Sequence, residues 1–155
     1  LQAVIAHELG HLKCEHGLWV TAANVLAMGL YSLGGPGEFL FRNLGLRRLL
    51  LQWSRAAEFT CDRAAMLVAQ DVDVVVSVLL KLVGGSITQA SELSVDAFLS
   101  QAAAYDAASR SRIGRLLRMN DEGMTHPLPV VRARELSRWA EGVQYAGILR
   151  RGQPL

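Results

Sequence analysis

The chain has 155 residues, of which 51% are hydrophobic and 19% charged. This composition predicts a folded domain with one core and excludes an intrinsically disordered chain. The net charge of +2 is too small, and the arginines too scattered, to predict a nucleic-acid partner. The first residue is Leu1 and no signal peptide is visible, so we interpret residues 1–155 as one domain excised from a longer precursor.

Helical periodicity dominates the chain and no segment alternates with a period of two, so the predicted fold class is all-α. Valine-rich residues 74–80 could be taken for a strand, but the possible caps Asp71 and Asp73 before them and the leucines after them favour a helix. Glycines supply most of the predicted breaks, and Gly45 would allow a kink. The expected helices cover residues 3–16 (ending at Gly17), 18–33, 39–70 (as one helix or two), a stretch from Asp71 or Asp73 to Gly84, 95–108 (capped by Ser94), 113–119 and 130–142.

The first of these helices contains a His-Glu-x-x-His motif formed by His7, Glu8 and His11. Residues four apart lie on the same face of a helix, about 6 Å along its axis, so both imidazoles can bind one zinc ion. Glu8 can reach a water molecule at the metal without binding it and act as its general base. The flanking residues are small or apolar, and histidines in a buried helix need polar partners, which favours a metal site over a chance motif.

A catalytic zinc site usually takes three protein ligands. His16 is the nearest further histidine, but it lies five residues after His11, a poor spacing for a ligand, and we interpret it as a surface histidine or as a neighbour of the ligands. Glu58 is the better candidate. Asp62, four residues after it on the same helix face, could accept a hydrogen bond from His7 and fix the imidazole.

The alternative for the acidic pair Glu58 and Asp62 is an exposed pair that bridges Arg55 or Arg63. We would prefer it if the His-Glu-x-x-His motif were absent. The alanines around the pair indicate a helix face that packs closely, which suits an inward carboxylate.

Three motifs in order resemble metallopeptidase family forty-eight, the gluzincin family of the HtpX and CAAX prenyl proteases. They are His-Glu-Leu-Gly-His at residues 7–11, the glutamate helix at residues 55–65, and Thr125-His126-Pro127 followed by Arg132. The sequences around the first two motifs are most similar to the plastid and cyanobacterial branch.

The resemblance implies a zinc endopeptidase with one Zn²⁺ per chain, bound by His7, His11 and Glu58, with Glu8 as general base. It also implies that Asp62 fixes a ligand. Protein or peptide substrates, a plastid location and a zincin-type core follow from the same resemblance. Gluzincins carry a substrate-binding edge strand before the first motif, and we expect that strand to lie upstream of Leu1.

The resemblance also implies roles for two residues near the end of the chain. His126 would stabilise the oxyanion of the tetrahedral intermediate, which suits a histidine donor near a metal. Arg132 would orient His126 or hold its loop, although a plain surface arginine is nearly as good an interpretation.

The two cysteines, Cys14 and Cys61, are too few for a secreted disulfide scaffold. They match no catalytic role in that family. We interpret them as small buried thiols in a reducing compartment rather than as zinc ligands.

Residues 18–33 form an apolar stretch without charges. As a helix it would be about 24 Å long, shorter than the roughly 30 Å hydrocarbon core of a bilayer, so a buried core helix is favoured over a membrane span. Residues 39–51 are apolar with three arginines and could lie in a membrane interface. We therefore predict association with a membrane surface rather than a span.

Three other functions remain open. The chain could be a catalytically inactive zinc-binding module that acts as a membrane-associated scaffold, but such a module has no need of Glu8. It could be a zinc hydrolase that does not cleave peptides, which only the family resemblance argues against. It could be a membrane-interaction protein with a chance motif, which would purify without zinc.

Overall fold

The computed structural model describes residues 1–37, 39, 45–84, 94–109 and 126–152. Every long element among these residues is an α-helix and none of them is a strand, which confirms the all-α prediction. The expected helix over residues 113–119 lies outside the described residues. The helices are α1 (Gln2–Lys13), α2 (His16–Ser32), α4 (Leu46–Ala69), α5 (Val72–Gly84), α6 (Val95–Ser109), α8 (Pro129–Ala140) and α9 (Val143–Arg151).

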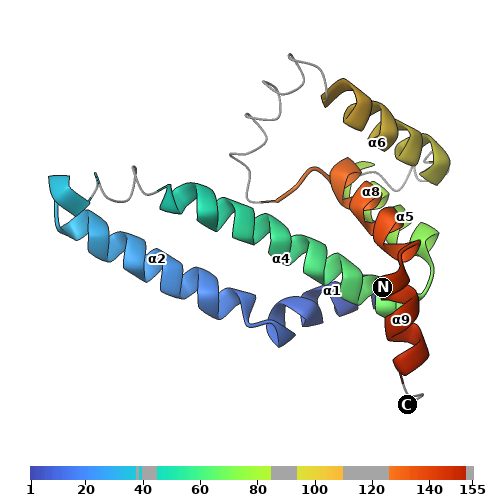
Figure 1. Ribbon diagram of the computed structural model, residues 1–155, viewed down its shortest axis with the longest axis horizontal. Helices are drawn as coiled ribbons and strands as arrows, with labels where there is room; N and C mark the ends of the chain where they lie inside the picture. Colours follow the sequence, from blue (N-terminus) through green and yellow to red (C-terminus); the bar gives the residue numbers. More distant parts are fainter. Residues whose placement is uncertain (38, 40–44, 85–93, 110–125, 153–155) are drawn as a thin grey trace.

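The long helix α4 organises the fold. Helix α1 packs along its C-terminal half, and α5 and α8 pack against that same half. Helix α6 lies on α5 and α8, and α9 follows α8 at the end of the chain (Figure 1). The segments that carry the three sequence motifs, α1, α4 and the start of α8, therefore meet along the C-terminal half of α4.

The packing of α1 on α4 depends on small residues. A Cβ atom added to Gly10 would lie 3.1 Å from the Cys61 sulfur and 3.3 Å from the Ala64 Cβ atom, tighter than most native contacts. Ala3 and Ala6 on α1 are also buried. Because these side chains are short, the two backbones approach closely and the polar side chains beside them can meet.

Two clusters of buried side chains hold the helices together. One joins α4, α5, α8 and α9, with Leu136 at 2% exposure and Trp139 packed on Tyr145 at a ring distance of 5.0 Å. The other joins α5, α6 and α8 around Val76 and Ala133, both fully buried. Both clusters contain residues of α5 and α8 and so fix the position of the last motif relative to α4.

Helix α2 is exposed, so the interpretation of residues 18–33 as a buried core helix is wrong. Its only buried residue is His16, its first. It extends away from the core beside the N-terminal half of α4 as an arm (Figure 1), and both helices line a shallow apolar groove that includes Trp19 and Trp53. Within the described part of the chain, no helix has the length and apolar character needed to cross a membrane.

Several predicted boundaries are confirmed and others are not. Asp71 caps α5 through hydrogen bonds from the next turn, and Ser94 caps α6 in the same way. The first helix ends at Lys13 rather than near Gly17, because the chain turns at Glu15, which adopts a left-handed φ of 54°. Gly45, with φ 62°, stands at the start of α4 rather than at a kink.

Candidate metal centre

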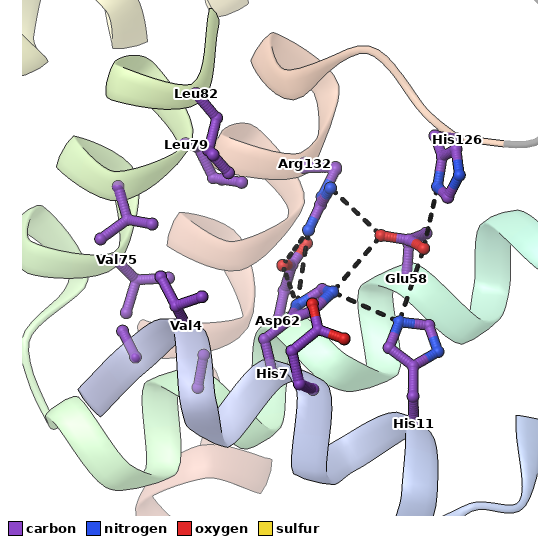
Figure 2. A pocket seen from close by; sticks show the side chains of 14 residues that line it. Val4, His7, His11, Glu58, Asp62, Val75, Leu79, Leu82, His126 and Arg132 are labelled. Atoms are coloured by element: carbon purple, nitrogen blue, oxygen red, sulfur yellow. Dashed lines mark hydrogen bonds and ion pairs between the residues drawn. The ribbon is translucent and has the colours of Figure 1, made fainter. Parts of the chain in front are cut away.

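His7 and His11 lie one turn apart on α1 and point toward α4, as Figure 2 shows. Their Nε2 atoms are 3.3 Å apart and face each other. Two neutral imidazoles cannot satisfy two converging lone pairs with each other, so a proton or a cation is needed between them.

Glu58 faces both imidazoles from the middle of α4. Its Oε2 atom lies 3.5 Å from Nε2 of His7, and its Oε1 atom lies 3.5 Å from Nε2 of His11. The residue is only 5% exposed, and so is not part of an exposed acidic pair. Two nitrogen atoms and one carboxylate therefore converge on one point between α1 and α4.

The separations of these atoms fit a metal ion. Nitrogen and oxygen ligands of a tetrahedral ion with bonds of about 2.0–2.1 Å must lie about 3.3–3.4 Å apart. The two Nε2 atoms are 3.3 Å apart, and each lies 3.5 Å from a different carboxylate oxygen of Glu58. The site is thus close to the required size, with each imidazole already turned so that Nε2 faces the centre.

Cys61 is the other candidate for a ligand on α4. Atoms of His7, His11 and the Cys61 thiol all lie within 4.8 Å of one another. Burial, together with the charge of Glu58, raises the pKa of the Cys61 thiol to about 12, so without a metal ion the group is a neutral thiol. Glu58, with both carboxylate oxygens at 3.5 Å from the imidazoles, fits the centre better.

Asp62 and Arg132 form a second polar layer behind His7. Asp62 accepts hydrogen bonds from Arg132 Nε at 2.8 Å and Nη2 at 2.6 Å, and its Oδ1 lies 3.1 Å from Nδ1 of His7. Arg132 Nη1 also lies 3.1 Å from Oε2 of Glu58. The interpretation of Arg132 as a plain surface arginine is therefore wrong, since its side chain is 12% exposed and pairs with both carboxylates.

These contacts set the charges of the layer. Burial opposes the charged form of His7, but the hydrogen bonds with Asp62 and Glu58 outweigh it and raise the pKa of His7 to about 9. Burial likewise opposes ionisation of Glu58, yet the hydrogen bond from His7 and the charge of Arg132 lower its pKa to about 2. Despite burial, Arg132 and His7 also lower the pKa of Asp62. In the metal-free protein the proton of His7 therefore supplies part of the positive charge that a metal ion would bring.

Comparison with known proteins identifies the family. Residues 1–140 match the sequence profile of peptidase family M48. The chain belongs to peptidase family M48. The prediction of this family from three short motifs is confirmed.

One curated M48 relative is the "Plastoglobule-localized metallopeptidase 48, chloroplastic" of Arabidopsis thaliana, 53% identical over 152 residues. The match covers 97% of this chain but 44% of the relative, so the chain spans less than half of the relative's length. The predicted similarity to plastid members of the family is confirmed. No solved structure matches the chain.

The M48 motif residues line one pocket of about 440 Å³ (Figure 2). Glu8 is exposed and lies on its wall, beside the two imidazoles. The opposite wall is apolar and is formed mainly by side chains of α5. The sequence did not predict this role, because apolar residues that line a pocket and apolar residues that fill a core show the same pattern. This wall consists of Val75, Val78, Leu79 and Leu82.

His126 lies at the rim of this pocket, where the chain approaches α8. Its Nδ1 is 2.9 Å from Oε1 of Glu58, and its side chain is 72% exposed. Arg132 contacts the carboxylates of Glu58 and Asp62, and its Nη2 lies 3.5 Å from Nδ1 of His7, so the residue that connects His126 to the centre is Glu58.

Proposed function

We propose that this M48 domain is a zinc-dependent endopeptidase, with one Zn²⁺ held by His7, His11 and Glu58 and with Glu8 as general base. The observation that carries the proposal is the convergence of two Nε2 atoms and one carboxylate at 3.3–3.5 Å from one another. Zinc suits this donor set because it accepts nitrogen and oxygen ligands in a tetrahedral site with one position left open.

A zinc ion bound there would lower the pKa of a water molecule to about 7 and polarise the carbonyl of the substrate. Glu8 would take the proton from the attacking water and later deliver it to the amine of the leaving peptide. Its exposure on the pocket wall leaves the carboxylate accessible to both.

Asp62 and Arg132 would act through their neighbours. Asp62 would accept the hydrogen on Nδ1 of His7, so that Nε2 is the nitrogen left to bind the metal once the metal displaces its proton. Arg132 balances the charge of the two buried carboxylates. Removing either residue should therefore weaken metal binding even though neither touches the metal.

His126 would stabilise the oxyanion that forms on the carbonyl oxygen. Because Nδ1 is engaged by Glu58 at 2.9 Å, Nε2 is the nitrogen that remains to face a substrate. Nε2 donates only when the ring carries both protons, or when the ring leaves Glu58 and changes tautomer.

A Glu8→Gln variant tests the mechanism. It should bind zinc as tightly as the wild-type chain and lose peptide cleavage, and a Glu141→Gln variant, at the exposed glutamate that ends α8, should retain both. Cleavage that survives in Glu8→Gln would refute the general-base role. An inactive wild-type chain that still binds one zinc would favour the alternative, a catalytically inactive zinc-binding scaffold.

A Glu58→Ala variant tests the ligand set. Zinc affinity, measured by competition with a chelator, should fall because a direct ligand is lost. Undiminished affinity in Glu58→Ala, together with a loss of affinity in Cys61→Ala, would instead assign the third ligand to Cys61.

We also propose that the domain acts at a lipid surface in the plastid. The name of the Arabidopsis relative places that protein at plastoglobules in the chloroplast. In this chain, α2 carries no Asp, Glu, Lys or Arg, and its apolar residues face solvent. Among the most exposed are Leu18, Val25, Leu26 and Met28, at 62–73%.

The first turns of α4, beside α2, add Arg47 and Arg48 without an acidic residue. An apolar helix with basic neighbours fits a lipid surface with anionic headgroups better than it fits water.

Flotation with vesicles that contain anionic lipid tests this location. The wild-type chain should float with the vesicles, and a double variant Val25→Glu, Met28→Glu should stay in the soluble fraction. Val143→Glu, at an equally apolar and 89% exposed position on α9, should float like the wild type. A wild-type chain that stays soluble at every salt concentration would refute the proposal.

A further inference from the structure

His16 is a buried polar residue that the proposed mechanism does not use. It is the first residue of α2 and is 9% exposed. Its Nδ1 lies 3.1 Å from Nδ1 of His11, and its ring meets Trp53 edge to face at 5.5 Å. The sequence interpretation left it as a surface histidine or a neighbour of the ligands, and the structure places it against His11.

The geometry of His11 defines which nitrogen carries the proton. Nε2 of His11 faces His7 and Glu58, so this is the atom that a metal would bind. A neutral imidazole that gives the lone pair of Nε2 to a metal carries its hydrogen on Nδ1. That N–H group then lies 3.1 Å from His16, within hydrogen-bonding distance.

We infer that His16 is the positioning residue of His11, accepting its Nδ1–H through Nδ1. The two metal-binding imidazoles would then be oriented in the same way by different acceptors, since Asp62 lies 3.1 Å from Nδ1 of His7. Partners of this kind fix the tautomer and the ring direction of a ligand. This inference rests on the proposed function, because it requires that His11 bind the metal.

The turn between α1 and α2 is what brings His16 to this position. Glu15 adopts the left-handed region at φ 54°, which ends α1 and starts α2 in a new direction. His16 then packs between His11, Cys61 and Trp53, with the Cys61 sulfur 3.7 Å from its Nδ1. The turn therefore places the His16 ring so that its Nδ1 faces Nδ1 of His11.

Three variants of the full chain separate orientation from packing. Asparagine carries an oxygen near the place of Nδ1 and keeps an acceptor, whereas leucine fills the volume without one and alanine removes both. Zinc affinity should fall about 10- to 100-fold in His16→Leu and His16→Ala. In His16→Asn it should stay within a few-fold of the wild type.

A spectroscopic readout reports on the hydrogen bond itself. In the zinc-loaded chain, the Nδ1–H protons of His7 and His11 should both exchange slowly with water in NMR spectra. His16→Leu should lose the protected signal of His11 and keep that of His7. The free energy of unfolding, measured with a chelator present, shows whether the variants remain folded.

Wild-type affinity and two protected signals in His16→Leu would overturn the inference and leave the proposed function intact. An equal loss of affinity in His16→Asn and His16→Leu would also overturn it, because it would mean that His16 acts through packing. A wild-type chain that binds no zinc would overturn the proposed function first.

Discussion

Replacing Arg132 by methionine should destabilise the metal-free protein strongly and in a pH-dependent way. Arg132 pairs at 2.6–3.1 Å with Asp62 and Glu58, which are 2% and 5% exposed. Removing one partner of a buried ion pair typically costs about 3–5 kcal/mol. The lowering of the Glu58 pKa from 4.5 to about 2 gives a consistent scale of about 3 kcal/mol, shared by His7, Arg132 and His126.

The pH dependence follows from the direction of these pKa changes. Both carboxylates have lowered pKa values, so their stabilisation is present above the unfolded values of 3.8 and 4.5 and is lost as the pH falls through the folded values, which for Glu58 is about 2. The difference between wild type and Arg132→Met should therefore be largest at neutral pH and shrink below about pH 4. Zinc should reduce it at pH 7, since the metal replaces part of the missing positive charge.

Urea unfolding with a chelator present measures this effect. At an m value of about 2 kcal/mol/M, a loss of 4 kcal/mol lowers the midpoint by about 2 M. Arg138→Met removes a half-exposed arginine whose partner is Glu135 at 3.4 Å, and should cost less than about 1 kcal/mol. A loss below 1 kcal/mol in Arg132→Met, or one that is unchanged at pH 3, would refute the reasoning.

Other perturbations test the charge, the close packing and the core. Because the pKa of His7 is about 9 in the metal-free protein, zinc must displace a proton from His7 in order to bind. The affinity of the chain for zinc, measured by calorimetric titration, should therefore rise about tenfold per pH unit between pH 6.5 and 8.5. An affinity that does not change with pH would contradict this. Gly10→Ala should lower the free energy of unfolding by about 1–2 kcal/mol, because the added Cβ atom would lie 3.1 Å from the Cys61 sulfur. Adding Cys61→Ala removes that sulfur and should restore part of the lost stability, whereas strictly additive effects of the two substitutions would argue against a steric origin. Leu136→Ala, at 2% exposure, should cost about 2–5 kcal/mol by urea unfolding, and a cost under 1 kcal/mol would mean that the core around it relaxes.

The sequence predicted the helical class and the caps at Asp71 and Ser94 because these depend on periodicity and on local hydrogen bonds. It misjudged the end of the first helix because the turn at Glu15 uses a left-handed conformation that glutamate rarely adopts. It did not predict α9, whose Tyr145 belongs to a buried cluster with residues of α4 and α5 that are distant in the sequence.

In the candidate site too, local features could be predicted from the sequence and contacts between separate helices could not. The spacing of His7 and His11 on one helix is local and was readable from the motif. Pairing these histidines with Glu58 was a hypothesis from the alanine-rich Glu-x-x-x-Asp face that the family resemblance strengthened, because spacing alone cannot show that two helices pack face to face. The partners of Arg132 depend on three separate helices, so the sequence left that residue undecided. The exposure of α2 could not be read either, since an apolar helix without charges has the same composition in a core and on a surface.

Because α4 is one continuous helix, the distance between its N-terminal turns and the pocket is fixed. The same uninterrupted helix carries Leu49 beside the α2 arm and Glu58 in the pocket, nine residues further on, which corresponds to about 14 Å along its axis. If the arm rests on lipid, this helix acts as a spacer between the lipid and the catalytic centre. Peptide bonds close to the lipid would then come within range, while those on domains that project far into solvent would stay beyond it.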